Sequence, residues 1–562
     1  MVLCQANAIT YTNLWIPPTL SGTVFNLSLN ITNKQFLPGT KTVTYAYNTN
    51  EFWGPTLIMD KGDNVQINLT NNLADTTTTH WHGFHIPAVM DGGPHEVIPA
   101  GTVWSPSFIV SNNASLYWYH PHLHTKTQDQ LTHGAGGLII IQDPQEAALA
   151  LPRTYGVDDI PVVLGSRRFS NNQFVLTNSA YGDYMLVNGV MDYGTTNVQV
   201  TLPKQVVRLR FLNSDIERTY NLGFSDNRNF YIIATDGGLV NTPILTNRVV
   251  MTVGERIQML VDLTSNTNSF DLMAYNSNTS LGGSGRTGLQ YDYPGAESQS
   301  SGQFGSLLNN SNFFIMHCVV GSTTSNSTPI TSIPLVLTTN IFWTTNDVTT
   351  NRTLSITGGA PGLFYFNTSD LFVFGTVNVT LHLNDVVKWT LINTSGFSHS
   401  FHIHDIQFNL ISRSSPAGGL AAFESQGWKD TLYSQASSTN VFIAKFDGFA
   451  SSYNPFMYHC HFSDHEDQGL MGQFEVVNNA AESLLISSFT RTGTNSNVAM
   501  RFKSTPGTTY LLQYSPNMDT SSWTNIGYIT SDGTSATYME TNSTRLVQSR
   551  GFYRVAIPVN SY

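Results

Sequence analysis

The chain has 562 residues, of which 40% are hydrophobic and only 11% are charged, and its formal net charge is −11. A chain of this length needs more than one hydrophobic core, so we expect several domains. The negative charge argues against a nucleic-acid partner, and the lack of a long apolar run argues against a membrane-spanning helix.

The first residues, MVLCQANAITYT, lack the basic and apolar segments of an export signal. The composition nevertheless implies a polar but uncharged surface, rich in Asn, Thr, Ser and Gly, which suits a protein outside the cytosol. We therefore predict a secreted or periplasmic protein from which the signal was removed.

Short strand-like segments recur along the chain, and helical periodicity is scarce. In chain order, examples are NVQINL at 64–69, GGLIIIQD at 136–143, VVRLRFLN at 206–213 and VVKWTLIN at 386–393. Gly, Asn, Asp or Pro separates such segments, which is typical of β-sandwiches and β-barrels. The sequence therefore predicts an all-β protein.

Three longer phrases resemble one another: KGDNVQINLTNNL at 61–73, VTLPKQVVRLRFLNSD at 200–215 and LNDVVKWTLINTS at 383–395. The first and third precede histidine-rich segments, and the second does not. We therefore expect three related β-domains, with the chemistry in the first and the third. The predicted boundaries are 1–150, 151–325 and 326–480, followed by a small β-rich module at 484–562.

Twelve of the sixteen histidines fall in four clusters, namely HWHGFH at 80–85, HPHLH at 120–124, HSFHIH at 399–404 and HCHFSDH at 459–465. Residues i and i+2 of a β-strand point to the same face, so a His-X-His pair presents two imidazoles that can bind one metal ion or bridge two. One such pair occurs easily by chance on a surface strand. Four pairs in one chain indicate a metal centre.

The last cluster places Cys460 between His459 and His461. If the two histidines face one way, the cysteine faces the other, and two metal centres can be joined through this segment. A cysteine with two histidines is the blue-copper arrangement for electron transfer, and His465 and His399 are the candidates for those histidines. Zinc also binds cysteine and histidine, but a zinc site gives no reason to connect a thiolate with many further histidines.

In order and spacing, HWHG, HPH, HSFHIH and HCHFSDHEDQGL resemble the copper motifs of the three-domain multicopper oxidases, the laccase family. The resemblance covers about residues 1–478, and the phrases HWHGFHIPAVMDGGPH, LPRTYGVDDIPVVL and GWKDT are most similar to bacterial laccases and periplasmic cuprous oxidases. It implies three cupredoxin-like Greek-key β-sandwich domains, the second without copper ligands. The last module lies outside the resemblance and is expected to be a small β-sandwich.

Carried over position by position, the resemblance implies four copper ions. The type 1 copper would be bound by His399, Cys460 and His465. The type 2 copper would be bound by His80 and His402. The type 3 pair would be bound by His82, His120, His122, His404, His459 and His461. For the other histidines we predict structural or surface roles: His85, His95, His124, His133, His317 and His382.

Three acidic residues are further candidates. Asp91, in AVMDGGPH, and Glu466, directly after His465, resemble the family's proton-relay residues, although either carboxylate could instead orient a ligand imidazole. Asp430, in GWKDT, is expected near the type 1 site, where it would contact the substrate or support a ligand. Cys4 and Cys318 could form a disulfide in an oxidising compartment, a pairing that the sequence does not test.

The leading hypothesis for function is a laccase-like oxidase that takes single electrons from phenols or aromatic amines and reduces dioxygen to water. Oxidation of Cu(I) in copper tolerance and a bilirubin-oxidase-like activity are alternatives, but the family's Cu(I) specialists carry a Met-rich insert, and here the fourteen methionines are scattered. A copper-free structural relative is a remote alternative, since every expected ligand is present. The expected partners are dioxygen, a small aromatic donor and Cu(I), and we expect a monomer.

One residue departs from the pattern of many bacterial relatives. Ten positions after Cys460, those relatives have a methionine as the weak axial ligand of the type 1 copper, whereas this chain has Leu470. Met471 follows, and on a strand its side chain would face away. A residue that does not coordinate copper is expected to raise the reduction potential of this site.

Overall fold

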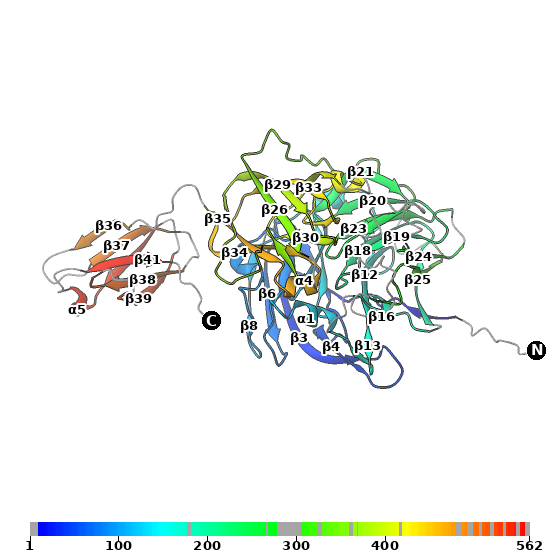
Figure 1. Ribbon diagram of the computed structural model, residues 1–562, viewed down its shortest axis with the longest axis horizontal. Coiled ribbons are helices and arrows are strands. Elements are labelled where there is room, and N and C mark those ends of the chain that lie inside the picture. Colours follow the sequence, from blue (N-terminus) through cyan, green and yellow to red (C-terminus); the bar gives the residue numbers. More distant parts are fainter. Residues whose placement is uncertain are drawn as a thin grey trace, which may run out of the picture. The chain divides into compact units, whose positions relative to one another are not determined.

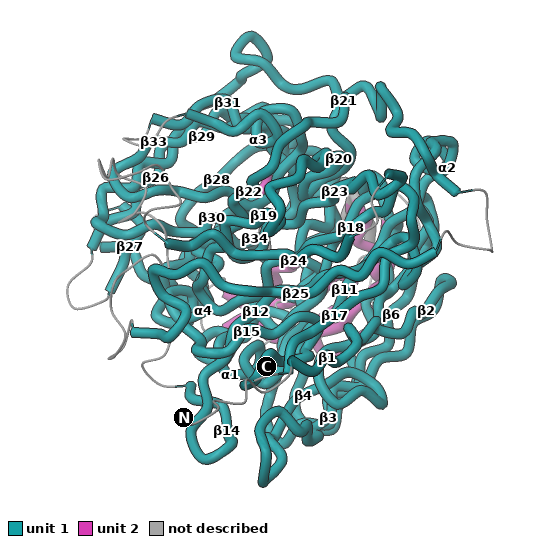
Figure 2. Tube along the Cα trace, turned by 90° about the vertical axis from the view of Figure 1, so that its right-hand side faces the viewer, with its two compact units in different colours: residues 1–475 teal, residues 476–562 magenta. Residues whose placement is uncertain are grey.

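The structure is a computed structural model that describes residues 9–556 except 177–180, 195, 266–267, 278–304, 323–328, 359–362, 368, 415–418, 478–485, 492–497, 505–508, 518–521, 532–534 and 547–550. Strands make up almost all of its regular structure, which confirms the predicted all-β fold (Figure 1). The chain forms two compact units, residues 1–475 and 476–562 (Figure 2). No helix within the described ranges is long and apolar enough to cross a membrane.

The first sandwich consists of two sheets. One has the order β2 (Thr19–Ser21), β5 (Thr56–Asp60), β11 (Gly137–Gln142), β10 (Ser115–His120) and β7 (His80–His82). The other has the order β4 (Thr42–Tyr47), β3 (Val24–Lys34), β6 (Asn64–Asn71) and β8 (Val103–Trp104), and β9 (Ser107–Ile109) also pairs with β6. Burial alternates along β6, so that Val65, Ile67 and Leu69 enter the core shared by the two sheets. Three short helical segments complete this part: η1 (Ala88–Met90), α1 (Thr127–Thr132) and α2 (Pro144–Ala147).

The second sandwich has larger sheets. The six-stranded sheet has the order β1 (Thr10–Asn13), β17 (Thr196–Leu202), β25 (Asn312–Val320), β24 (Phe270–Tyr275), β19 (Tyr220–Phe224) and β22 (Val249–Met251). The seven-stranded sheet has the order β16 (Val190–Met191), β15 (Tyr184–Val187), β12 (Asp159–Arg167), β18 (Val206–Asn213), β23 (Arg256–Asp262), β20 (Phe230–Thr235) and β21 (Gly238–Thr246). A separate hairpin joins β13 (Phe169–Ser170) to β14 (Gln173–Phe174).

The N-terminal strand β1 lies in this second sandwich, although the predicted boundary places it in the first domain. Its residues pair in parallel with β17, with Thr10 opposite Thr196. The first segment of the chain therefore completes a sheet that forms almost 200 residues later.

The third sandwich contains the last two histidine clusters. One sheet has the order β27 (Phe364–Phe366), β26 (Thr350–Gly358), β29 (Asp385–Asn393), β33 (Thr439–Phe446) and β31 (Phe408–Ser414). The other has the order β28 (Val379–His382), β35 (Met471–Val477), β34 (Ser451–Cys460), β30 (His399–Ile403) and β32 (Thr431–Ser434). The helices here are α3 (Ala422–Gln426) and α4 (Ser463–Asp467).

The second unit is a small β-structure with its own core. Its sheets are β36 (Ile486–Arg491), β37 (Val498–Lys503) and β40 (Ser535–Glu540), and β39 (Thr524–Thr530), β38 (Thr509–Ser515) and β41 (Phe552–Ala556), with helix α5 (Ser543–Leu546). Phe502, Leu512 and Val555 belong to one buried cluster that joins the two sheets.

Two antiparallel strand pairs position the histidines. In the first sandwich, β7 and β10 place His80 opposite His120. In the third, β30 and β34 place His402 opposite His459. Cross-strand neighbours have closely spaced side chains, so each pair of strands brings two histidine clusters together.

Candidate metal centres

The first candidate centre, here called the thiol group, consists of His399, Cys460 and His465. The Cys460 Sγ lies 3.6 Å from His399 Nδ1 and 3.7 Å from His465 Nδ1. All three residues are buried, and they come from β30, from the end of β34 and from α4. Both imidazoles therefore direct Nδ1 at the sulfur, an arrangement suited to holding one ion among three ligands.

An aromatic ring packs against the thiol group, and the Ser395 hydroxyl lies 3.0 Å from His399 Nε2. The ring of Phe364 lies 4.6 Å from the ring of His399 and 4.6 Å from that of His465. Burial raises the pKa of the Cys460 thiol and lowers the pKa of both histidines. A bound cation is therefore needed to hold the cysteine as a thiolate.

The second candidate centre, here called the histidine group, gathers eight buried imidazoles from four strands and the residues that follow them. Its members are His80, His82, His120, His122, His402, His404, His459 and His461. Two sets of three ligand nitrogens can each hold one ion: one set comes from His82, His120 and His461, and the other from His122, His404 and His459. His80 and His402 are the remaining two members.

Imidazole nitrogens face one another in the histidine group at close range. The Nε2 atoms of His122 and His459 are 3.0 Å apart, and those of His122 and His404 are 3.2 Å apart. Burial is the largest cause that lowers the pKa of these three histidines well below its ordinary value. Neutral imidazoles whose lone pairs point at a common space are arranged as metal ligands.

A single strand end connects the two groups. Cys460 belongs to the thiol group, whereas His459 and His461 on either side of it belong to the histidine group. The alternation of side chains along an extended chain produces this division.

The comparison with known proteins agrees with this arrangement. Three family models, each described as multicopper oxidase, match residues 30–146, 165–293 and 344–480. The chain belongs to the multicopper oxidase family.

Similar proteins align with most of this chain. A multicopper oxidase of Staphylococcus haemolyticus is 28% identical over 446 residues, which are 77% of this chain and 84% of that protein. The solved structure of a laccase-like multicopper oxidase, CueO of Ochrobactrum sp., is 27% identical, with a TM-score of 0.71, and covers 83% of this chain and 100% of its own. The cell division protein FtsP of Proteus mirabilis is 25% identical over 482 residues, 84% of this chain and 94% of that protein.

The ligands of this multicopper oxidase fit copper. The Nε2 atoms of His80, His120 and His402 are buried and have no hydrogen-bond partner in the described part of the chain. A buried imidazole nitrogen without a partner costs stability unless it binds a metal. Imidazoles together with one thiolate are a donor set that copper prefers. The thiol group would hold one ion, and the histidine group would hold the others.

Asp91 lies against two ligands of the histidine group. Its carboxylate Oδ2 is 2.6 Å from His404 Nδ1, and its carbonyl oxygen is 2.9 Å from His80 Nδ1. A Cβ on the next residue, Gly92, would lie 1.7 Å from the carbonyl oxygen of Thr79, so only glycine lets this segment approach the ligands so closely. The side chain is thus placed both to orient an imidazole and to exchange a proton.

Glu466 is the corresponding carboxylate on helix α4. Its oxygens lie 3.3 Å from His122 Nδ1 and 3.4 Å from His459 Nδ1, and the Thr127 hydroxyl donates to it at 2.7 Å. Burial raises the pKa of this carboxyl group well above its ordinary value, which favours the protonated form. Thr127 was not among the residues predicted from the sequence, because nothing local marks a threonine that contacts a residue more than 300 positions away.

Asp430 lies at the histidine group, whereas the sequence placed it near the type 1 site. Its side chain is fully buried, and Oδ1 is 3.1 Å from His82 Nε2. Its carbonyl oxygen is 2.8 Å from His402 Nδ1. A fully buried carboxylate has no access to a substrate in solution, so the support of a ligand is the role that this position allows. Its partner Arg256 was also missed by the sequence reasoning.

Leu470 is tied to two members of the thiol group through its backbone. Its carbonyl oxygen accepts from the Cys460 amide at 3.0 Å, and its own amide donates to the His465 carbonyl at 2.9 Å. The neighbouring Met471 packs with Phe372 and Met457 in a separate buried cluster. The assignment of Leu470 as the axial residue remains a prediction.

Six histidines lie outside both groups, and several have their own partners. His85, His133 and His317 pair with Asp405, Asp129 and Asp271, respectively. His95 hydrogen bonds to Gln473, and His124 packs on Phe372. Cys318 is a buried free thiol, and Cys4 lies outside the described residues.

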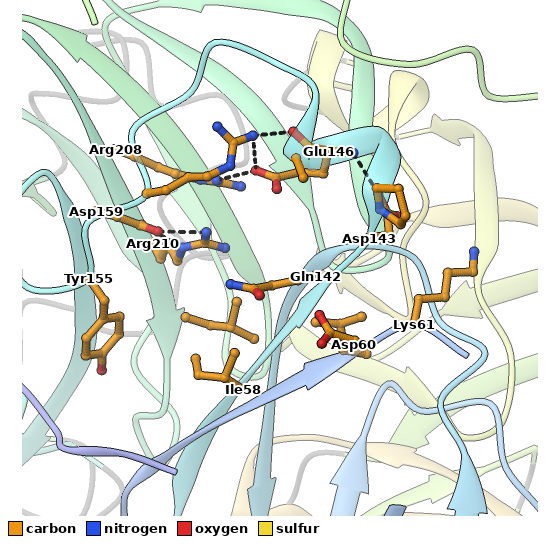
Figure 3. A pocket seen from close by; sticks show the side chains of 15 residues that line it. Ile58, Asp60, Lys61, Gln142, Asp143, Glu146, Tyr155, Asp159, Arg208 and Arg210 are labelled. Carbon is orange, nitrogen blue, oxygen red and sulfur yellow. Dashed lines mark hydrogen bonds and ion pairs between the residues drawn. The ribbon is translucent and has the colours of Figure 1, made fainter. Parts of the chain in front are cut away.

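A cavity of about 370 Å³ lies between the first and second sandwiches, away from both groups (Figure 3). Its polar wall consists of ion pairs, in which Arg208 points at Glu146 and Arg210 at Asp159. None of the ligand histidines lines it. Its arginines are already paired with Glu146 and Asp159, and the cavity is part of the contact between the two sandwiches.

Proposed function

We propose that this multicopper oxidase is laccase-like: it oxidises phenols or aromatic amines one electron at a time and reduces dioxygen to water. The observation that carries the proposal is the placement of Cys460 in the thiol group and of His459 and His461 in the histidine group. That placement separates a site for single electrons from a site with room for several metal ions. The four copper ions and their type 1, type 2 and type 3 roles are part of this proposal.

Bound copper would supply the one-electron redox chemistry and the affinity for oxygen. The chain's own residues do the rest. His465 is only 3% exposed, so an electron donor would lie against the protein surface near it without binding the metal. The segment from Cys460 to its two flanking histidines is the covalent path for the electron.

An aromatic donor is supported by the residues around the thiol group. Phe364 contacts both ligand imidazoles, and its neighbour Leu363 is 40% exposed. Val373 and Phe374 are 58% and 54% exposed, and the amide of Phe372 beside them donates to the Gly469 carbonyl oxygen at 3.0 Å. This apolar surface favours a small aromatic ring over a charged donor.

The protons that oxygen reduction consumes need carriers at the histidine group. Asp91 and Glu466 are two of the three carboxyl groups in contact with its imidazoles, at His404 and His122, and the third, Asp430, is held in an ion pair with Arg256. We propose that Asp91 and Glu466 relay protons, and that Asp91 in addition holds His404 in its ligand orientation.

Oxidation of Cu(I) is the second candidate. Two methionines, Met457 and Met471, pack beside Phe372, and thioether sulfur is a ligand that Cu(I) prefers. Both are only 1% exposed, however, and no methionine stands in the 363–375 segment beside the thiol group. A copper-free structural role is the third candidate, but it gives no reason for the chain to contain the metal ligands of both groups.

The test is a comparison of donors on the copper-loaded protein. We expect about four copper ions per chain, a blue thiolate-to-copper absorption band, and oxygen uptake with a phenol. A strong preference for Cu(I) over the phenol would contradict the laccase assignment. A colourless chain that takes up no copper would favour the structural role.

A further inference from the structure

No described residue of the second sandwich belongs to either ligand group, yet one of its side chains reaches the histidine group. Arg256, the first residue of β23, is fully buried. Its Nη1 and Nη2 donate to the two carboxylate oxygens of Asp430, at 2.7 Å and 2.5 Å. Asp430 in turn lies 3.1 Å from His82 Nε2, so only one residue separates Arg256 from a ligand.

His82 differs from the other seven members of the histidine group. Those seven direct Nε2 into the group: in His80, His120 and His402, for example, Nδ1 faces a backbone carbonyl and Nε2 has no partner in the described part of the chain. In His82 the roles are reversed, because Nε2 faces Asp430 and Nδ1 lies 3.2 Å from His461 Nε2. His82 alone offers Nδ1.

The carboxylate of Asp430 at His82 Nε2 explains why His82 directs Nδ1 into the group. A neutral imidazole has one N–H and one lone pair, and a carboxylate can only accept. Asp430 therefore places the proton of His82 on Nε2 and leaves the lone pair on Nδ1, toward His461. The Thr431 hydroxyl, which donates to Asp430 Oδ1 at 2.9 Å, helps to fix that oxygen.

Arg256 itself is anchored by all three sandwiches. Its guanidinium donates to the carbonyl oxygens of Leu116 in β10 and of Gly254 beside β23, at 3.2 Å and 3.0 Å, and it reaches Asp430 ahead of β32. The planar fork of arginine matches a carboxylate with two parallel bonds, which lysine cannot do.

We propose that Arg256 is a positioning residue of the histidine group: by holding Asp430 with two hydrogen bonds, it determines that His82 offers Nδ1 to copper. The competing explanation is that Arg256 serves only as an ion pair between sandwiches. The proposal rests on copper binding by the histidine group, as in the proposed function, but the nitrogen that carries the proton can also be measured without copper.

The experiment compares Arg256→Lys and Asp430→Asn with a matched control, Arg210→Lys. Arg210 also lies in the second sandwich, is 5% exposed, and holds Asp159 with two bonds of 2.7 Å and 2.8 Å, but contacts no ligand histidine (Figure 3). The loaded proteins are dialysed against EDTA, and the copper per chain and the blue absorption are followed. On the copper-free proteins, ¹⁵N NMR reports which nitrogen of His82 carries the proton.

We expect Arg256→Lys and Asp430→Asn to weaken copper retention in the histidine group about 10- to 100-fold, while the blue band persists. His82 should lose its uniform Nε2–H form in both: in Arg256→Lys because one oxygen of Asp430 is no longer held, and in Asp430→Asn because the single amide oxygen replaces two carboxylate oxygens that accept from Arg256 and His82. Arg210→Lys should keep both wild-type properties even if it melts earlier. If Arg256→Lys and Asp430→Asn retain copper and the Nε2–H form as the wild type does, Arg256 is an ion pair only.

The two proposals fail in different ways. A wild-type chain that binds no copper would contradict the proposed function, while the His82 proton would still decide the role of Arg256. If Asp430→Asn does not fold, Arg256→Lys, which keeps the charge, carries the test with the NMR readout.

Discussion

The thiol group and the histidine group share one strand end but have different surroundings. Aromatic rings pack against the thiol group, with Phe364 against both of its imidazoles and Phe462 beside His465. Carboxylates support the histidine group, where Asp91, Glu466 and Asp430 each contact a ligand. A site that only exchanges electrons needs no proton carrier, whereas oxygen reduction consumes protons. The difference in surroundings thus matches the division of labour that we propose.

The largest effect is expected when the thiol group is broken. Cys460→Ser removes the only sulfur ligand of that group, so the blue absorption and the oxidation of phenols should fall to the detection limit. The histidine group should still bind its share of copper, because Cys460 does not belong to it. Loss of all copper in this variant would mean that the two groups do not load independently.

Glu466→Gln tests whether a carboxyl group beside the histidine group supplies protons. It removes an exchangeable proton beside His122 and His459, so kcat with oxygen should fall about 10²- to 10⁴-fold. Reduction of the blue band by a phenol without oxygen should stay at the wild-type rate. Asp464→Asn, on the same helix, is the control, because the ion pairs of His122 and His459 in the described part of the chain are with Glu466 and not with Asp464. A slowed anaerobic reduction would show that Glu466 acts on electron transfer instead.

Asp91→Asn separates proton relay from ligand support. Asparagine can still accept from His404 Nδ1 but cannot take up a proton, so a relay predicts a lower kcat with normal copper retention. A supporting role predicts about 10- to 100-fold weaker copper binding only in Asp91→Ala, which removes the acceptor, and near-normal binding in Asp91→Asn. Copper titration alongside oxygen uptake distinguishes the two roles. Wild-type values of both in both variants would remove Asp91 from the proposed mechanism.

A local rule predicted the division of Cys460 from His459 and His461, whereas the full membership of the two groups was implied by the family resemblance. Alternation along a strand puts His459 and His461 on one face and Cys460 on the other, and the structure brings these residues into separate groups. The all-β fold followed from short apolar segments between turn residues. Patterns of this kind are contained in a few neighbouring residues.

Contacts between distant segments left no such pattern. The strand β1 pairs in parallel with β17, and a parallel pair gives no turn or spacing from which it could be read. Arg256 reaches Asp430 across 174 positions, and in the sequence it only begins one strand-like segment among many. Asp430 was misplaced for the same reason, since its neighbours in sequence do not reveal that it faces His82.

The smallest expected effect concerns Leu470, the predicted axial residue of the thiol group. Leu470 is bonded through its backbone to Cys460 and His465, and its side chain is 1% exposed. Leu470→Met would add a thioether that can donate electron density to an oxidised copper and so lower its reduction potential. We expect a decrease of roughly 60 mV, a tenfold change in a one-electron equilibrium, in a redox titration of the blue band. Met471→Leu is the control, because Met471 packs with Phe372 and Met457. If the potential is unchanged in Leu470→Met but shifts in Met471→Leu, the axial position belongs to Met471.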